Sequence, residues 1–276
     1  MIKDIVVNLT TGVERDAAMH YAISLASTFK ANLDGVAFVV NPKASPNLIA
    51  GIPIEVIDAQ RVANRNLANE AVARFEASAK QAGVMTESQI LDVAPGNVGD
   101  TFGRIARRYD LSVIRQAEPN KTGQEGLIVE GALFESGRPL IVVPYVQTQG
   151  AKFDRVMVGW DGSRTAARAI GDAIPLLKGA KMIEVFTVAT GSAKNPEVSM
   201  ADIGRHLSRH GLNVEVKRIA TEDINVPDAI LSHAADISAD FMVIGGYGHS
   251  RLREFVLGGV TRSILSAMTL PTLMSN

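Results

Sequence analysis

A glycine-rich stretch near the end of the chain contains residue types well suited to holding an anion. It begins with Gly245–Gly248 and, after nine further residues, reaches Gly258–Thr261, where a helix is predicted to start. Glycines let a backbone approach a phosphate group closely, and the free N–H groups in the first turn of a helix point toward such a group. Glycines that only make tight turns would have the same spacing, so the neighbouring elements must decide between the two interpretations.

The stretch lies in the second of two similar halves. The strand-like run Asp4–Val7 is matched by Arg155–Val158, and Tyr109–Ile114 is matched by Ala239–Ile244. Each half alternates strands with helices, which is typical of a parallel sheet covered by helices on both faces. We therefore predict two tandem doubly wound α/β domains, residues 1–147 and 152–276, each with a mostly parallel five-stranded sheet flanked by helices.

The predicted elements place the glycine-rich stretch after a strand. The second half should contain strands at Arg155–Gly159, Met182–Val188, Asn213–Ile219, Asp240–Ile244 and Pro271–Met274, and helices at Ser163–Leu177, Glu197–His210, Pro227–Ser238 and Gly259–Ala267. The first half adds a long helix, about Glu55–Ala82, with apolar positions at helical spacing: Val62, Leu67, Ala71, Phe75 and Ala79. Parallel sheets bind ligands at the carboxyl ends of their strands, which is where the stretch begins.

Composition narrows the class of protein. The 276 residues include no cysteine and carry a formal net charge of −1. The lack of cysteine excludes disulfides, thiolate nucleophiles and thiolate metal sites, and the balanced charge argues against a nucleic-acid partner. No apolar core of a signal peptide is present, and no apolar stretch approaches the ~20 residues that span a bilayer. We predict a cytoplasmic protein with no membrane partner.

Other reactive side chains have ordinary structural explanations. His206 and His210 could share one face of a helix, but no third metal ligand accompanies them, so a solvated face is the better interpretation. Ser163 and Thr165 fit helix caps better than nucleophiles, because no partner base is recognisable. Trp160 is expected to pack at a strand end rather than to stack on a ligand. We predict no catalytic residue and no metal site.

Three motifs together resemble the universal stress protein family. Gly245-x2-Gly248-x9-Gly258 matches the family pattern G-x2-G-x9-G-[S/T], except that Gly259 stands where the pattern has Ser or Thr. The run Val158–Ser163 resembles the family's V-D-G-S, and Pro271–Met274 resembles its closing strand. The resemblance covers nearly the whole chain as two tandem domains, and it implies the adenine nucleotide alpha hydrolase-like fold.

The resemblance also implies a nucleotide site in the second half. Asp161 would contact the adenosine moiety of ATP, and Ile244 and Gly245 would line the nucleoside pocket. The phosphates, with or without Mg²⁺, would be surrounded by Gly248, Gly258, Gly259, Val260 and Thr261. Gly259 lacks the hydroxyl donor of the pattern, and losing one hydrogen bond to a charged group costs roughly 1.5–3 kcal/mol, so we expect weakened phosphate binding.

The first half does not keep this site. Thr10 stands where Asp161 stands, and Arg115–Gly126 lacks the glycine spacing. Glu118 and Glu125 would also repel a phosphate. We interpret the first half as a degenerate, structural domain.

Three functions remain open from the sequence. The first is a stress-response protein that binds ATP or a related adenine nucleotide as a regulatory ligand. The second is an interaction protein without a nucleotide, acting through edge strands such as Leu140–Val143 and Thr272–Met274. Pairing of these two strands would make the chain an internal pseudo-dimer, and two chains could also form a homodimer. The third is a slow, incidental ATPase.

Overall fold

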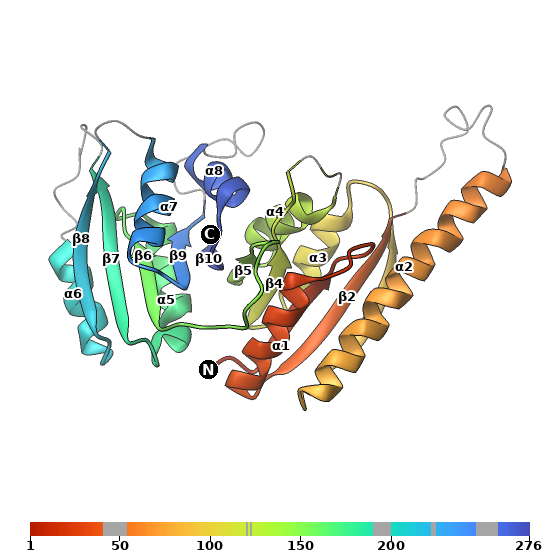
Figure 1. Ribbon diagram of the computed structural model, residues 1–276, viewed down its shortest axis with the longest axis horizontal. Coiled ribbons are helices and arrows are strands. Elements are labelled where there is room, and N and C mark those ends of the chain that lie inside the picture. The colour runs from red at the N-terminus through yellow and green to blue at the C-terminus, as the bar shows by residue number, and fades with distance from the viewer. Residues whose placement is uncertain (41–53, 120, 122, 190–199, 222–224, 247–258) are drawn as a thin grey trace.

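The chain forms two halves with the same order of elements (Figure 1). The computed structural model describes residues 1–40, 54–119, 121, 123–189, 200–221, 225–246 and 259–276. The first half contains β1 (Asp4–Leu9), α1 (Ala17–Phe29), β2 (Asn32–Val40), α2 (Ile54–Gln81), β3 (Ser88–Val93), α3 (Val98–Ala106), β4 (Leu111–Arg115), α4 (Glu125–Glu135) and β5 (Leu140–Val143). The second contains β6 (Arg155–Gly159), α5 (Arg164–Leu177), β7 (Met182–Ala189), α6 (Met200–Arg209), β8 (Val214–Ala220), α7 (Val226–Asp236), β9 (Phe241–Gly245), α8 (Gly259–Ala267) and β10 (Thr272–Ser275).

All ten of these strands join one sheet, in the order β3-β2-β1-β4-β5-β10-β9-β6-β7-β8. Every neighbouring pair is parallel except β5 and β10, which pair antiparallel with Ile141 opposite Leu273. The predicted α/β class with a mostly parallel sheet is therefore confirmed. The pairing of β5 with β10 also gives each of these strands a neighbour on both sides, so neither presents a free edge.

Two hydrophobic cores cover the two faces of the sheet. One core packs α1, α2, α5 and α6 against the strands, and the other packs residues of α3, α4, α7 and α8 against the opposite face. Strand residues such as Val156, Met157 and Val158 are fully or almost fully buried, as expected for strands covered on both sides. Each core contains residues from both halves, so the halves share their hydrophobic interior.

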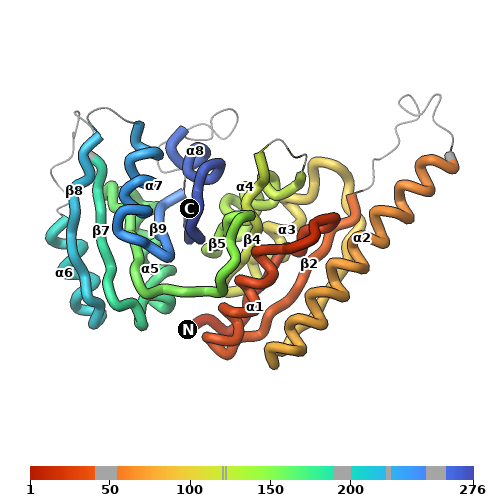
Figure 2. The backbone as a smooth tube through the Cα atoms, in the orientation of Figure 1, coloured from red at the N-terminus to blue at the C-terminus, as the bar shows by residue number. Residues whose placement is uncertain are grey.

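A single extended segment connects the halves. Figure 2 shows the chain leaving β5 and running along the molecule to β6. Arg15 of the β1–α1 connection donates to the carbonyl of Thr148 in this segment, at 2.9 Å, and the Ala151 N–H donates to Ser24 Oγ of α1, at 3.0 Å. Phe153 packs edge-on against Phe29 of α1 and against Phe241 of β9. The segment is thus fixed to both halves.

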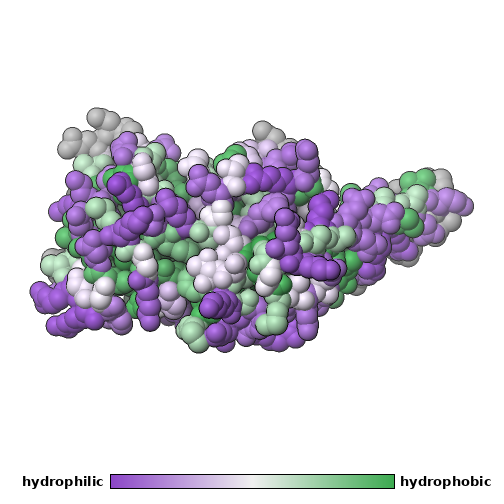
Figure 3. Space-filling view, turned by 60° about the horizontal axis from the view of Figure 1, so that its bottom comes forward, coloured by the Kyte–Doolittle hydropathy of each residue, from purple (hydrophilic) through white to green (hydrophobic). Residues whose placement is uncertain are grey.

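The long helix α2 projects beyond the sheet, and its exposed surface is largely hydrophilic (Figures 1 and 3). The predicted long helix is present, at Ile54–Gln81. Of the apolar residues at helical spacing, Ala71, Phe75 and Ala79 are buried, but Val62 is 60% exposed and Leu67 is 38% exposed. About three and a half turns separate Val62 from Phe75 and place it on the opposite side of the helix.

The remaining element boundaries agree closely with the sequence predictions. The strand Arg155–Gly159 and the helix Gly259–Ala267 coincide with β6 and α8. The predicted start of α6, Glu197, lies outside the described residues. Among the helices of the described parts of the chain, none is long and apolar enough to cross a bilayer.

Candidate functional site

The carboxyl ends of β6 and β9 lie side by side, because these strands pair in parallel with Val158 opposite Val243. Asp161 follows β6 by two residues and is exposed to solvent. Its Oδ1 accepts the backbone N–H of Ser163 at 2.9 Å, and Ser163 Oγ in turn accepts the N–H of Ala166 at 3.1 Å and begins α5. The carboxylate is therefore held at the start of a helix, at the edge where the predicted ligand would bind.

Gly245 ends β9 in direct contact with the first turn of α5. A Cβ at this position would lie 2.5 Å from the Ala166 nitrogen and 2.7 Å from Thr165 Oγ1, which no real side chain tolerates. The glycine is required here by the close approach of strand and helix. This contact brings Ile244 and Gly245 to the same edge of the sheet as Asp161.

The phosphate end is described only in part. Gly259 and Val260 are exposed in the first turn of α8, and Thr261 is buried. These residues supply N–H groups that have no partner within the helix. A Cβ at Gly259 would have no heavy atom of the described residues within 4 Å, so the missing Ser or Thr of the motif is not excluded by packing. Gly248 and Gly258 lie outside the described residues.

Two residues next to the site have structural roles. Trp160 packs against the hydrophobic core that contains the buried residues of α5, as predicted. Its Nε1 has no hydrogen-bond partner within the described structure. Thr165 is buried, and its Oγ1 lies 3.1 Å from Ser163 Oγ, beneath Gly245. The sequence indicated a helix cap for both Ser163 and Thr165, but Ser163 is the cap and Thr165 fills the contact between β9 and α5. The spacing alone gave no signal for that contact.

The first half has a different arrangement at the equivalent edge. The parallel pair β1–β4, with Ile5 opposite Leu111, matches β6–β9, with Val156 opposite Phe241, and this register places Arg115 where Gly245 stands. The connection before the helix is also longer in the first half. It has seven residues, Thr10–Asp16, between β1 and α1, against four, Trp160–Ser163, between β6 and α5.

Paired charges occupy this edge of the first half. The buried guanidinium of Arg115 pairs with Glu118, and its Cζ lies 5.9 Å from the centre of the Tyr145 ring. The hydrogen bonds from Arg115 and Lys121 lower the pKa of Glu118. Burial raises the pKa of Asp16, and the backbone N–H groups that it accepts, together with Arg115, partly offset this. The first half thus places a salt-bridged network where the second has glycine.

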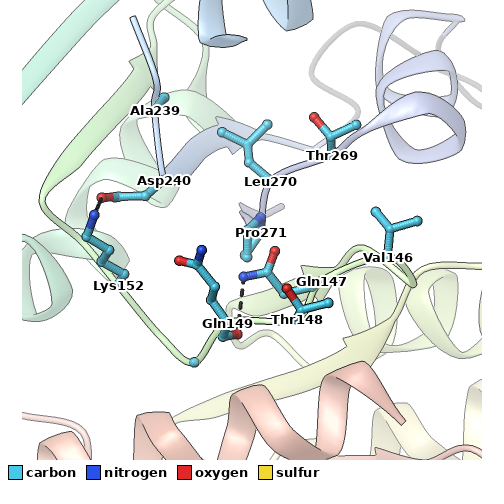
Figure 4. A pocket seen from close by; sticks show the side chains of 11 residues that line it. Val146, Gln147, Thr148, Gln149, Lys152, Ala239, Asp240, Thr269, Leu270 and Pro271 are labelled. Carbon is cyan, nitrogen blue, oxygen red and sulfur yellow. Dashed lines mark hydrogen bonds and ion pairs between the residues drawn. The ribbon is translucent and has the colours of Figure 1, made fainter. Parts of the chain in front are cut away.

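A separate hollow lies at the opposite, amino-terminal ends of β9 and β10 (Figure 4). It holds about 220 Å³ between the connecting segment, residues 146–150, and the turn that leads into β10. Lys152 pairs with Asp240 on its wall, and the Asp240 carboxylate also accepts the N–H groups of Asp154 and Arg155. Burial raises the pKa of Asp240, and these hydrogen bonds, together with Lys152, offset the rise only in part. The hollow therefore belongs to the junction between the halves, away from the predicted site.

Known proteins share both the sequence and the fold. Residues 152–276 match the model of the universal stress protein family. The chain is 23% identical over 219 residues to universal stress protein Slr1230 of Synechocystis, which covers 76% of this chain and 72% of the relative. It is 26% identical over 145 residues to universal stress protein YxiE of Bacillus subtilis, which covers 44% of this chain and 98% of the relative.

A solved structure shows the same architecture over the full length. The crystal structure of a universal stress protein from Archaeoglobus fulgidus superposes with a TM-score of 0.71 and 18% identity, covering 98% of each chain. The molecule therefore has the adenine nucleotide alpha hydrolase-like α/β fold that the motifs implied. The match of residues 152–276 shows a universal stress protein domain in the second half, and the chain as a whole is similar in sequence and fold to proteins of that family.

Proposed function

We propose that the second half binds ATP or a related adenine nucleotide as a regulatory ligand in a stress response. The observation that carries this proposal is the contact of Gly245 with the start of α5. This contact gathers Asp161, Ile244 and Gly245 at the carboxyl ends of β6 and β9. Ligands of open parallel sheets bind at this edge. The family match of residues 152–276 supports the same assignment.

In the proposed complex, each predicted site residue contacts a particular part of the nucleotide. Asp161 accepts a hydrogen bond from the adenosine moiety, and Ile244 and Gly245 line the nucleoside pocket. Backbone N–H groups hold the phosphates, at Gly248, Gly258, Gly259, Val260 and Thr261. The positive end of the α8 dipole favours the negative phosphates by about 0.3–1 kcal/mol. Mg²⁺ would bind through the phosphates, because no group of three or more acidic or histidine side chains among the described residues could hold a metal ion.

The two halves have unequal roles in this proposal. We assign residues 152–276 as the nucleotide-binding domain and residues 1–147 as a degenerate structural domain that forms an internal pseudo-dimer with it. The antiparallel pairing of β5 with β10 supports this arrangement. An interaction protein without a nucleotide would need another surface, because β5 and β10 already have neighbours on both sides. The cytoplasmic location stays a prediction from the lack of cysteine.

Nucleotide binding can be tested on the purified full chain. The protein is heat-denatured, the supernatant is analysed by mass spectrometry for a co-purified nucleotide, and ATP with Mg²⁺ is titrated into the protein by calorimetry. Asp161→Ala and Gly258→Glu should each weaken binding. A wild-type protein with neither a co-purified nucleotide nor a calorimetric signal would refute the proposal.

Hydrolysis is tested on the same proteins. Slow ATP turnover that is lost in both variants would assign an incidental ATPase to the site. Turnover that survives in both variants would identify a contaminating enzyme.

A further inference from the structure

Gln116 and Gly246 occupy equivalent positions in the two halves. Each follows its strand directly, β4 or β9, and each donates its backbone N–H to the strand alongside: Gln116 to Val143 O at 2.7 Å, and Gly246 to Ser275 O at 2.9 Å. Each also contacts the other half, at equivalent positions near the ends of α4 and α8. The chemistry of the two contacts differs, and both involve elements of the proposed nucleotide site.

Gln116 of the first half holds helix α8 of the second. Its Nε2 donates to the carbonyl of Leu265 at 2.9 Å, and its Oε1 accepts the N–H of Tyr145 at 3.3 Å. The residue is 1% exposed, so both ends of its amide are paired in a buried setting. Leu265 lies within two turns of Gly259, where the phosphates are proposed to bind. The hydrogen bond therefore fixes the helix whose first turn would contact the ligand.

Leu133 of the first half supports Gly246 of the second. A Cβ at Gly246 would lie 2.8 Å from Leu133 Cδ2 and 3.0 Å from Cδ1. Leu133 is buried in α4, and the Gly246 carbonyl accepts Asn276 Nδ2 at 3.0 Å. A larger residue at this position would force the buried Leu133 side chain or the end of β9 to shift. Gly246 directly follows Gly245, so its position sets where the glycine-rich stretch leaves the sheet.

We propose that the first half, which lacks a nucleotide motif, positions the nucleotide site of the second half through the Leu133–Gly246 contact and the Gln116–Leu265 hydrogen bond. The inference rests on the proposed nucleotide binding. The first half is then a support for the second, and Gln116 stands where the second half has Gly246. Gln116 and Leu133 are positioning residues, because they act through α8 and Gly246 and not on the ligand.

The Leu133–Gly246 contact is tested by a rescue experiment on the full chain. Gly246→Ala forces the new methyl group against Leu133, so the end of β9 must shift from its position beside Asp161, and the dissociation constant for ATP should rise about fivefold or more. Leu133→Ala removes the two methyl groups that clash with the new Cβ. The double variant should therefore recover affinity to within about twofold of the Leu133→Ala single variant.

The Gln116–Leu265 hydrogen bond is tested by Gln116→Met, which keeps the length of the side chain but removes both the donor to Leu265 and the acceptor of the Tyr145 N–H. Loss of one buried hydrogen bond that holds α8 should raise the dissociation constant for ATP about fivefold. Ser24→Ala is the matched control, because it also removes one hydrogen bond between the first half and the segment leading to the second, far from α8. ATP affinity should be unchanged in this control.

The outcomes separate the inference from the proposed function. ATP binding by the wild-type protein with no rescue in the double variant would show that Gly246 acts on the ligand directly and would overturn the positioning role of Leu133. Wild-type affinity in Gln116→Met, or equal losses in Gln116→Met and Ser24→Ala, would overturn the role of Gln116. No ATP binding by the wild-type protein would overturn the proposed function and this inference together.

Discussion

The glycine-rich stretch differs from the family pattern at one position, where Gly259 lacks the hydroxyl group of Ser or Thr. No described residue lies within 4 Å of a Cβ built at Gly259, so no described neighbour blocks a serine there. The hydroxyl could donate to a bound phosphate from the first turn of α8.

Gly259→Ser should tighten ATP binding about tenfold or more, because a hydrogen bond to a charged group is worth roughly 1.5–3 kcal/mol. Calorimetric titration with ATP and Mg²⁺ measures the effect. Gly259→Ala is the control, since it adds the Cβ without the hydroxyl and should leave the affinity near that of the wild-type protein. Equal effects of serine and alanine would show that the backbone conformation, and not the donor, was altered.

Asp16 provides a test of electrostatics in the degenerate site. Burial raises the pKa of its carboxyl above the ordinary value of 3.8, so the folded protein binds this proton more tightly than the unfolded chain. The associated stabilisation is complete below the unfolded pKa and is lost as the pH rises through the folded pKa. Asp16→Asn removes this titration and keeps one side-chain oxygen for the Ala18 and Met19 N–H groups.

The unfolding free energy of the wild-type protein, relative to Asp16→Asn, should therefore fall as the pH rises from about 4 toward 7. Urea denaturation at a series of pH values measures this difference. A difference that grows with pH would mean that the three N–H groups bonded to the carboxylate, with Arg115, outweigh burial.

At the residue level, the assignment of the nucleotide-binding residues stays a prediction. The glycine motif indicated Ile244 and Gly245, and the structure brings both to the edge that holds Asp161. Nothing in the motif indicated that Thr165 fills the space under Gly245. Arg115 could have been found by aligning the two halves, which places a long charged side chain opposite a glycine. Its network with Glu118 depends on folding and on the longer β1–α1 connection.

At the scale of elements, α5 connects the candidate site to the rest of the domain. Ser163 caps this helix through the Ala166 N–H, and its own N–H is held by Asp161. Ser163→Ala should lower the unfolding free energy by ~1 kcal/mol, since an N-cap side chain satisfies one of the free donors of a helix. Urea denaturation measures the loss. Ser208→Ala, an exposed substitution on α6, should change stability by less than about 0.5 kcal/mol.

Strands and helices were largely predictable from the sequence because each buries a continuous apolar run or an apolar face. The helix α2 shows where this reasoning ends. Its periodic residues predict a helix, but the part of the helix that lies against the sheet decides which of them are buried. Val62 lies on the side of the helix opposite Phe75, so its exposure follows from how the helix is oriented against the sheet.

At the scale of the molecule, the shared cores predict cooperative unfolding. Both cores contain residues of both halves, and the β5–β10 pair completes one sheet. Trp160, the only tryptophan, reports on the second half, whereas far-ultraviolet circular dichroism reports on both. The two signals should follow a single urea transition with the same midpoint. Two separated midpoints would show that the halves unfold independently.

The repeat in the sequence predicted the doubled fold, and the pairing of the strands Leu140–Val143 and Thr272–Met274 was among the arrangements that it left open. The observed register, with Ile141 opposite Leu273, could not be predicted, because short buried strands carry little information about their partners. The sequence also did not indicate the different contacts that Gln116 and Gly246 make with the other half, because these contacts depend on how the two halves pack together.

Because β5 and β10 belong to one polypeptide, the residues on the two sides of their junction can differ. In a symmetric homodimer each interface residue occurs twice, so one substitution alters both copies of a contact. Here the two sides of the junction are encoded separately, and one can hold a glutamine where the other holds a glycine. The association is also unimolecular, so dilution cannot separate the halves, and the melting temperature should not depend on protein concentration.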